Sequence, residues 1–359
     1  MRVSLLEPIF FHLNNLYCQI AGLLSPLITL SPLVLRIRIT SKCNLSCPFC
    51  YLKTGLNRDE EGNLSLEEWE RILSKLPKRT IVDLTGAEPL MYKDIRGFLN
   101  ILSSCKLKYS MTTNGTVYNG LTAKEIVEKG LYVLMVSLDG TEKVHDELRG
   151  KSGAFARTLD FLKEVEKEKA RQGKSRPFIN IKTTVLDENI DDLNLLLKSL
   201  GQEIPCDTLT LSLLFQNRAR GGMELYDDIN ASGLQAGNTA RYVEKRKVSS
   251  FFKELKTKKN SYKVSVRPRM NYSDIEKYIE SPASMHVESC PQFKNTITLN
   301  YDGNISPCDI SFKLGNIRDH EYDLRSIYRT QKFERFKSLF KKRDPICEGC
   351  CSGLHTSKD

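Results

Sequence analysis

The chain has 359 residues, of which 40% are hydrophobic and 27% charged, a composition that belongs to folded globular proteins and excludes wholesale disorder. Its 54 Lys and Arg residues against 44 Asp and Glu residues give a formal net charge of +10. No basic run with interleaved aromatic residues indicates a nucleic-acid surface, so no nucleic-acid partner is expected. Eleven cysteines without a secretory signal indicate metal binding in a reducing compartment, and the expected location is the cytoplasm.

The first segment, residues 1–33, is apolar but is interrupted by polar residues and by Pro26 and Pro32. No run of about 18 apolar residues survives these breaks, so a membrane-spanning helix is not expected. We expect an amphipathic helix that packs on the rest of the fold. The alternative is a peripheral membrane contact through residues 5–35, with which the positive net charge of the chain is compatible.

From residue 34 to about 215, short β-rich apolar runs alternate with helical stretches. The predicted strands are 34–40, 79–85, 107–112, 131–138, 177–185 and 207–215, and the predicted helices are 65–76, 92–104, 122–129, 152–172 and 189–200. The helix at 65–76 begins with a capping box formed by Ser65 and Glu68. This alternation predicts an α/β fold with parallel strands joined by right-handed crossovers, either as an open doubly wound sheet or as a barrel.

Two further regions complete the chain. Residues 216–285 are lysine-rich and predict a linker or cover with a helix near 239–258. Residues 286–359 hold five of the eleven cysteines, a hairpin turn at Asp302 and Gly303, and a basic helix around 323–343. We therefore expect four parts: an N-terminal segment 1–33, a core 34–215, a cover 216–285 and a small C-terminal hairpin and helix extension 286–359.

The first predicted strand leads directly into a loop with three cysteines, Cys43, Cys47 and Cys50. Core cysteines are not spaced so closely, and the carboxyl end of a strand is where α/β proteins place their sites. A closed zinc or iron–sulfur site needs four protein ligands. Three thiolates would therefore leave one metal position open to an external ligand.

This Cys-x3-Cys-x2-Cys pattern, with Phe49 before the last cysteine, resembles the signature of the radical S-adenosylmethionine (radical SAM) superfamily. The resemblance covers about residues 35–200 and implies a partial (β/α)6 barrel rather than a doubly wound sheet. It also implies that the three cysteines hold a [4Fe–4S] cluster whose fourth iron is chelated by S-adenosylmethionine. Reductive cleavage of that cofactor would give a 5′-deoxyadenosyl radical that takes a hydrogen atom from the substrate.

Later segments match other motifs of the family at successive strand ends. The stretch from Thr85 to Leu90 resembles the Gly-Gly-Glu-Pro motif, whose backbone and glutamate hold the amino group of the cofactor, although Ala87 replaces the second glycine. The resemblance implies a cofactor-binding set of Phe49, Gly86, Ala87, Glu88, Asn114, Ser137, Arg149 and Thr184, in which Ser137 and Arg149 bind the methionine carboxylate and nearby hydroxyls. His145 is expected to be a surface residue at a helix start, and no catalytic residue is assigned.

The C-terminal cysteines form a second group. Cys290 and Cys308 flank the hairpin, and Cys347 and Cys350 form a Cys-x2-Cys pair beside Cys351. This group resembles the SPASM/twitch extension of some radical SAM enzymes. Because full SPASM domains carry more cysteines, the resemblance implies the shorter twitch form with one auxiliary [4Fe–4S] cluster. Its expected ligands are the first four residues named here, with Cys351 as a substitute for Cys350, and a zinc ribbon would use the same four.

The functional hypothesis is a radical SAM enzyme that acts on a small molecule, with the auxiliary cluster handling electrons in an oxidation or bond-forming step. A reducing partner such as flavodoxin or ferredoxin is expected. Two alternatives are radical modification of a peptide and radical modification of a membrane lipid. A third, from another class, is a non-catalytic iron–sulfur or zinc scaffold.

Overall fold

The computed structural model describes residues 34–50, 52–117, 123–213, 244–257, 262–267, 274–280, 285–287, 296–307, 312–341 and 355–357. A ten-stranded sheet dominates these residues, in the order β11-β10-β9-β1-β2-β3-β4-β5-β6-β7. Its strands are β1 (Val34–Arg38), β2 (Ile81–Thr85), β3 (Lys108–Thr113), β4 (Val133–Ser137), β5 (Phe178–Val185), β6 (Thr208–Leu213), β7 (Lys263–Arg267), β9 (Thr296–Asn300), β10 (Asn304–Ser306) and β11 (Gly315–Asn316). The strands β8 (Met285–Val287) and β12 (His355–Ser357) form a separate antiparallel pair.

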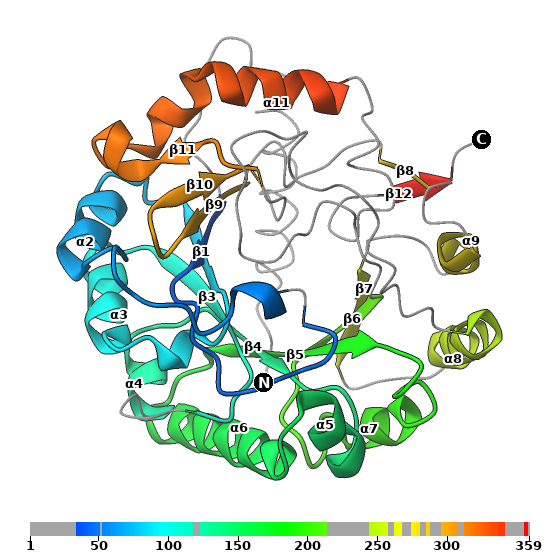
Figure 1. The fold of residues 1–359 in the computed structure, drawn as a ribbon. Helices are drawn as coiled ribbons and strands as arrows, with labels where there is room; N and C mark the ends of the chain where they lie inside the picture. The colour runs from blue at the N-terminus through cyan, green and yellow to red at the C-terminus, as the bar shows by residue number, and fades with distance from the viewer. Residues whose placement is uncertain are drawn as a thin grey trace.

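Helices lie around the outer face of the curved sheet, as Figure 1 shows. They are α2 (Leu66–Ser74), α3 (Ile95–Ser104), α4 (Ala123–Glu128), α5 (Glu142–Arg149), α6 (Ala154–Arg171), α7 (Leu193–Ser199), α8 (Lys245–Thr257), α9 (Ile275–Glu280) and α11 (Gln331–Lys341). Short 3-10 helices occur at Lys53–Gly55, Pro89–Met91, Ile317–His320 and Leu324–Arg329. The chain thus has the α/β architecture with parallel core strands that the alternation predicts.

The six predicted core strands are all present and pair in chain order, β1 to β6, as parallel neighbours. The sheet continues beyond them on both sides. β7 pairs parallel with β6, and β9 pairs parallel with β1, with Arg38 opposite Asn300. The division at residues 215 and 285 stays a prediction, because the sheet takes strands from all three regions that follow residue 33.

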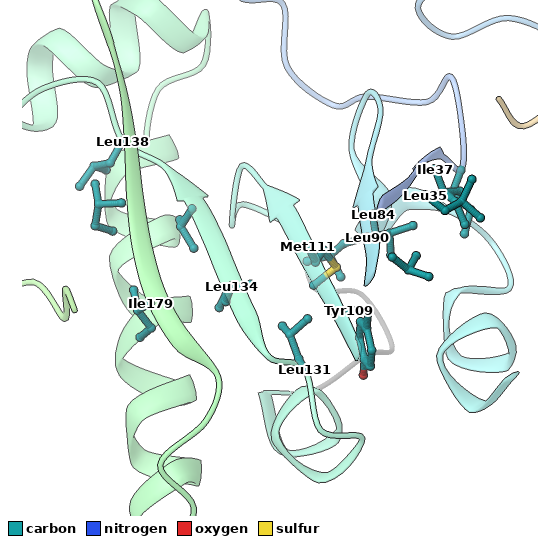
Figure 2. Packing of buried hydrophobic residues seen from close by; sticks show 14 of the residues in the cluster. Leu35, Ile37, Leu84, Leu90, Tyr109, Met111, Leu131, Leu134, Leu138 and Ile179 are labelled. Carbon is teal, nitrogen blue, oxygen red and sulfur yellow. The ribbon is translucent and has the colours of Figure 1, made fainter. Parts of the chain in front are cut away.

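The hydrophobic core lies between the sheet and the helices. Alternate strand residues point toward the helices, because successive side chains of a strand face opposite sides. These residues are fully buried, for example Leu35 and Ile37 on β1 and Tyr109 and Met111 on β3 (Figure 2). On the helix side, Trp69 of α2 packs edge-on against Phe98 with ring centroids 5.4 Å apart.

The predicted capping box is confirmed at the start of α2. Glu68 Oε2 accepts a hydrogen bond from the Ser65 backbone N–H at 2.9 Å, and the Ser65 hydroxyl oxygen accepts one from the Glu68 backbone N–H at 3.2 Å. The same carboxylate holds the C-terminal extension. Arg318 donates to it from Nε at 2.6 Å and from Nη2 at 2.9 Å, and the Tyr322 hydroxyl donates at 3.0 Å. One side chain therefore caps α2 and ties residues near 320 to the core.

Replacing Glu68 with Gln is expected to loosen the C-terminal extension and to lower the free energy of unfolding by about 1–3 kcal/mol, the range of hydrogen bonds to charged groups. The Arg318 guanidinium lowers the pKa of Glu68 from 4.5 to about 2. A lowered carboxyl pKa stabilises the fold above pH 4.5, and this contribution is lost as the pH falls toward 2. Urea unfolding at pH 7 and pH 3 should therefore show a smaller difference between the two proteins at pH 3. Glu70→Gln, at an exposed position of the same helix, should leave the free energy of unfolding unchanged at both pH values.

In the described part of the chain, none of the helices combines the length and the apolar content that crossing a bilayer requires. The helix expected within residues 1–33 lies outside the described residues, as does the end of the strand predicted at 207–215. The basic helix expected at 323–343 is split. It forms a 3-10 segment at Leu324–Arg329 and then α11, because Thr330 adopts an extended conformation between them.

Candidate functional site

The three clustered cysteines lie on the loop that follows β1. Cys47 is buried, whereas Cys43 and Cys50 are half-buried. The backbone N–H of Cys50 donates to the Cys47 carbonyl at 3.1 Å, and the Cys43 N–H donates to Asn57 Oδ1 at 3.0 Å. The loop is therefore held by its own turn and by the segment before α2, and all three thiols belong to one short, ordered stretch.

These thiols are in an environment that disfavours their ionisation without a metal. Burial raises the pKa of the Cys43 thiol to about 11. Burial also raises the pKa of the Cys50 thiol, and the nearby Arg149 guanidinium offsets only part of this increase. Thiolate ligands must lose their protons, and metal binding supplies the free energy for it. Among the described residues, no three Cys, His, Asp or Glu side chains converge on a single metal ion. Three thiolates on one loop suit a [4Fe–4S] cluster, because each of them binds a different iron.

The turn after β2 packs closely on the cysteine loop. Gly86 has a φ of +124°, and a Cβ there would lie 3.1 Å from the Thr40 carbonyl oxygen and 3.3 Å from Arg38 Cα. Only glycine allows both this backbone conformation and this approach. Ala87 does not require a positive φ, so the alanine that replaces the second glycine of the motif is accommodated without strain.

Glu88 is fully buried at this turn and joins the ends of β2 and β3. Its Oε1 accepts from the Thr113 hydroxyl at 2.7 Å and from the Leu90 N–H at 3.0 Å, and its Oε2 accepts from the Asn114 N–H at 2.7 Å. The Glu88 N–H in turn donates to the Lys42 carbonyl at 2.9 Å, next to the first cysteine. The carboxylate thus orders the junction of the loop and two strands, and its role toward a cofactor amino group stays a prediction.

Burial raises the pKa of Glu88 from 4.5 to about 7 in spite of its three donors. A raised carboxyl pKa stabilises the fold below pH 4.5, and this contribution is lost as the pH rises to about 7. The shift corresponds to roughly 3 kcal/mol. The urea midpoint of the metal-free wild-type chain should fall relative to that of Glu88→Gln between pH 4.5 and pH 7.5. A constant difference would mean that Glu88 is ionised throughout this range.

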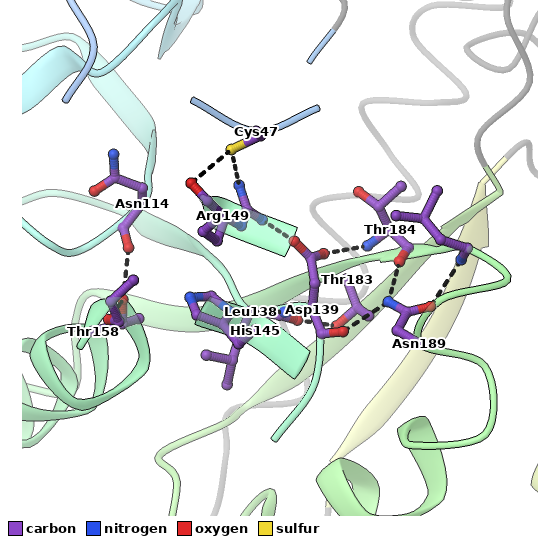
Figure 3. A network of polar contacts seen from close by, with 12 residues as sticks. Cys47, Asn114, Leu138, Asp139, His145, Arg149, Thr158, Thr183, Thr184 and Asn189 are labelled. Atoms are coloured by element: carbon purple, nitrogen blue, oxygen red, sulfur yellow. Dashed lines mark hydrogen bonds and ion pairs between the residues drawn. The ribbon is translucent and has the colours of Figure 1, made fainter. Parts of the chain in front are cut away.

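Arg149, the last residue of α5, reaches the cysteine loop from the opposite side. Its Nη1 donates to Cys47 Sγ at 3.8 Å, and its guanidinium lies 5.6 Å from the centre of the Phe49 ring. Its Nη2 forms an ion pair with Asp139, which follows β4 (Figure 3). Arg149 Nε is buried and has no hydrogen-bond partner within the described structure. Of the three guanidinium nitrogens, Nε is therefore the one without a partner among the described residues, and it can donate to a ligand.

Gly150 allows α5 to end against the loop. It caps the helix with a φ of +64°, and a Cβ at this position would lie 2.6 Å from Ser46 Oγ. Glycine at this point favours the left-handed cap and permits the close packing. The end of α5 and the cysteine loop are consequently in direct contact, which places Arg149 beside Cys47.

Near Arg149, one residue differs from its predicted position and another is missing from the predicted site. His145 was expected on the surface, but it is 1% exposed, because it packs on the Phe155 ring and its Nδ1 accepts from the Asp139 N–H at 3.1 Å. Asp139 was not included in the predicted site, although it stands two residues after Ser137. The Ser-x-Asp-Gly spacing at a strand end is the only sequence signal for it.

The remaining predicted residues lie at neighbouring strand ends. Asn114 Nδ2 donates to Asn44 Oδ1 at 3.0 Å, so the end of β3 is joined to the cysteine loop. Thr184 on β5 donates its N–H to Asp139 Oδ1 at 2.7 Å. Ser137 ends β4 and is half-buried. The structure thus brings the predicted core set to one end of the parallel sheet, whereas Cys290, Cys308, Cys347, Cys350 and Cys351 lie outside the described residues.

Two family models match the chain. A model of the radical SAM superfamily matches residues 37–200, and a model of the SPASM iron–sulfur cluster-binding domain matches residues 290–351. Residues 37–200 therefore belong to the radical SAM superfamily, and residues 290–351 belong to the SPASM type of iron–sulfur extension. Its cofactors are S-adenosylmethionine and a [4Fe–4S] cluster in the core, with iron–sulfur binding in the extension.

Sequence relatives match less than half of the chain. The sporulation killing factor maturation protein SkfB of Bacillus subtilis is 30% identical over 136 residues, which are 37% of this chain and 33% of that protein. The Fe-coproporphyrin III synthase of Methanosarcina barkeri is 29% identical over 167 residues, 46% of this chain and 40% of the relative. The chain therefore matches less than half of the length of either relative.

Solved structures share the fold over most of the chain. Streptococcus suis SuiB bound to S-adenosylmethionine has a TM-score of 0.63 at 17% identity, covering 90% of this chain and 73% of SuiB. SuiB bound to the precursor peptide SuiA has a TM-score of 0.64 at 16% identity, covering 99% of this chain and 78% of SuiB. At such identities the likeness concerns the fold alone.

Proposed function

We propose that the chain reductively cleaves S-adenosylmethionine and uses the resulting 5′-deoxyadenosyl radical to abstract a hydrogen atom from its substrate. One observation carries the proposal. The cysteine loop, the buried Glu88 turn and the Arg149 end of α5 come from distant parts of the sequence and meet at the carboxyl end of the parallel sheet. Parallel α/β sheets place their ligands at this end.

In this proposal Cys43, Cys47 and Cys50 hold the [4Fe–4S] cluster, which supplies the electron for cofactor cleavage when it is bound. The protein's own groups bind and orient the cofactor. Arg149 retains a free Nε–H donor suited to a carboxylate, and Phe49 offers an apolar face beside it. Gly86 and Ala87 bring backbone groups close to the loop, where they can accept from the amino group of the cofactor.

We propose a small polar molecule as substrate. The sheet face turned away from the helices is lined with hydrogen-bonding side chains, such as Asp83, which accepts from Arg36 at 3.1 Å and from Ser110 at 3.0 Å. Asn180 likewise donates to Thr208 at 2.6 Å across β5 and β6. The name of the Fe-coproporphyrin III synthase, a relative that acts in small-molecule synthesis, supports the same class.

Peptide modification is the second candidate, and the comparisons supply its support. SkfB is named as a maturation protein for a sporulation killing factor, and SuiB has been solved with its precursor peptide. We keep the auxiliary [4Fe–4S] cluster on Cys290, Cys308, Cys347 and Cys350, and a flavodoxin or ferredoxin as electron donor, as parts of both candidates. Modification of a membrane lipid through residues 5–35 is a further alternative without structural support.

Anaerobic reconstitution tests the proposal. The iron-loaded chain, supplied with S-adenosylmethionine and dithionite, should produce 5′-deoxyadenosine. An iron-loaded chain that binds the cofactor but never cleaves it would contradict the proposal and favour a scaffold. Deuterium transfer into 5′-deoxyadenosine from deuterated metabolite and peptide pools then separates the two substrate classes.

A further inference from the structure

We propose that Asp139 is a positioning residue that fixes Arg149 against the cluster ligand Cys47, so that the Cys47 side of the cluster and the cofactor carboxylate site share one guanidinium. This inference rests on the proposed function, because it assigns a cluster to Cys47 and a cofactor carboxylate to Arg149. It concerns a residue that lies outside the predicted site and that binds no cofactor itself.

Asp139 is itself rigidly held. It is fully buried, and its Oδ1 accepts from the Thr184 N–H at 2.7 Å. Its backbone N–H donates to His145 Nδ1 at 3.1 Å, and its carbonyl accepts from Asn189 Nδ2 at 2.7 Å (Figure 3). These bonds come from α5, β5 and the segment after β5. Both the backbone and one carboxylate oxygen are thereby fixed, and only Oδ2 remains for the ion pair with Arg149.

Arg149 has few other restraints on its guanidinium. Its side chain is 11% exposed and its Nε has no partner in the described residues, so the contacts of Nη2 with Asp139 and of Nη1 with Cys47 define its orientation. The Cys47 thiol also approaches the Arg149 carbonyl at 3.9 Å, but this contact requires the thiol proton and is lost in a thiolate. The Nη1 donor persists and becomes charge-assisted, because a thiolate accepts from a cation.

The consequence is a coupling between two parts of the site. A hydrogen bond to a ligand sulfur raises the reduction potential of an iron–sulfur cluster. In the proposed function the same guanidinium donates its Nε–H to the cofactor carboxylate. If Asp139 holds the guanidinium in place, its removal should weaken both effects, although Asp139 touches neither group.

The sign of the potential change tests this. Asp139→Asn removes a negative charge, which alone would raise the potential of the nearby cluster. If Arg149 instead loses its position, the potential should fall toward that of Arg149→Gln. The measurement is an EPR-monitored redox titration of the cluster whose signal changes when S-adenosylmethionine is added. A higher reduction potential in Asp139→Asn than in the wild type would show that Arg149 stays in place without Asp139, and it would overturn the proposal.

A double-mutant cycle on cofactor affinity gives an independent test. Asp139→Asn should weaken S-adenosylmethionine binding about tenfold in the otherwise unmutated protein, on the scale of one charge-assisted hydrogen bond. In the Arg149→Gln background it should change the affinity by less than about twofold, within the usual additivity error. Equal losses in both backgrounds would mean that Asp139 acts independently of Arg149 and would also overturn the proposal. The double variant carries a neutral amide pair, whereas each single variant leaves one buried charge without its partner, so the folded fraction of both single variants is measured alongside their affinity.

Asp83→Asn is the matched control. Asp83 also forms an ion pair with an arginine, Arg36, but it lies on β2, where its carboxylate contacts Arg36 and Ser110 of the neighbouring strands. Its substitution should leave the cluster potential unchanged. The iron content of the wild-type chain distinguishes failure of the proposed function from failure of the role assigned to Asp139. A wild-type chain that binds no iron on the three cysteines refutes the proposed function, whereas a normally loaded wild type with additive variants refutes only the role of Asp139.

Discussion

A chain in which Cys43, Cys47 and Cys50 are all replaced by Ala is expected to lose about four irons after reconstitution, the content of one [4Fe–4S] cluster. It should also form no 5′-deoxyadenosine, because in the proposed assignment the auxiliary cluster has four cysteine ligands of its own and therefore no open position for the cofactor. Iron analysis and chromatography of the reaction products measure the two effects. This is the largest change that we expect from any substitution in the chain.

Cys206→Ala is the control for this result. Cys206 is half-buried, and its thiol donates to the Thr208 carbonyl at 3.2 Å, away from the cysteine loop. Its loss should leave the iron content unchanged. Continued production of 5′-deoxyadenosine by the triple variant would refute the assignment of the three ligands, even if the chain remained folded and loaded with iron elsewhere.

Arg149→Ala is expected to have two effects of different origin. S-adenosylmethionine binding should weaken by about 1.5–3 kcal/mol, the scale of a charge-assisted hydrogen bond. The fold should also lose about 3–5 kcal/mol, because the fully buried Asp139 carboxylate is left without its counter-charge. Equilibrium dialysis with the labelled cofactor measures the first effect, and urea unfolding of the metal-free chain measures the second.

Arg157→Ala, at an exposed position of the neighbouring helix α6, should show neither effect. The iron content of the Arg149 variant should stay normal, since the residue is not a ligand. Destabilisation with an unchanged cofactor affinity would show that Arg149 is only structural and that the methionine carboxylate is held elsewhere.

The core strands could be predicted because each is a short run of β-branched and aliphatic residues between polar breaks. Val34–Arg38 and Phe178–Val185 are examples, and both lie within two residues of their predicted bounds. The pairing of β9 with β1 could not be predicted in this way. Strand propensity is local, whereas the choice of a partner some 260 residues away depends on the sheet that is already present.

Helix α5 shows a second limit of prediction from the sequence. Its residues, Glu142–Arg149, are mostly charged, and two of the three that are buried are His145 and Arg149. Polar residues are normally exposed, so a hydrophobic pattern does not reveal a helix whose inner face is polar. Asp139 could not be predicted as a site residue for the same reason. A buried carboxylate is tolerated only because its arginine is supplied by the next helix, and that proximity is a property of the fold.

The parallel pairing of β9 with β1 also bears on how the chain folds during synthesis. While the first 290 residues emerge from the ribosome, β1 has β2 on one side and an open edge on the other. At translation rates of 5–20 residues per second, the second edge of β1 stays unpaired for roughly 13–50 s before β9 is synthesised. An unpaired edge is a template for association with other chains. Nascent chains that stop before residue 296 should therefore aggregate or recruit chaperones, and those that include β9 and β10 should not.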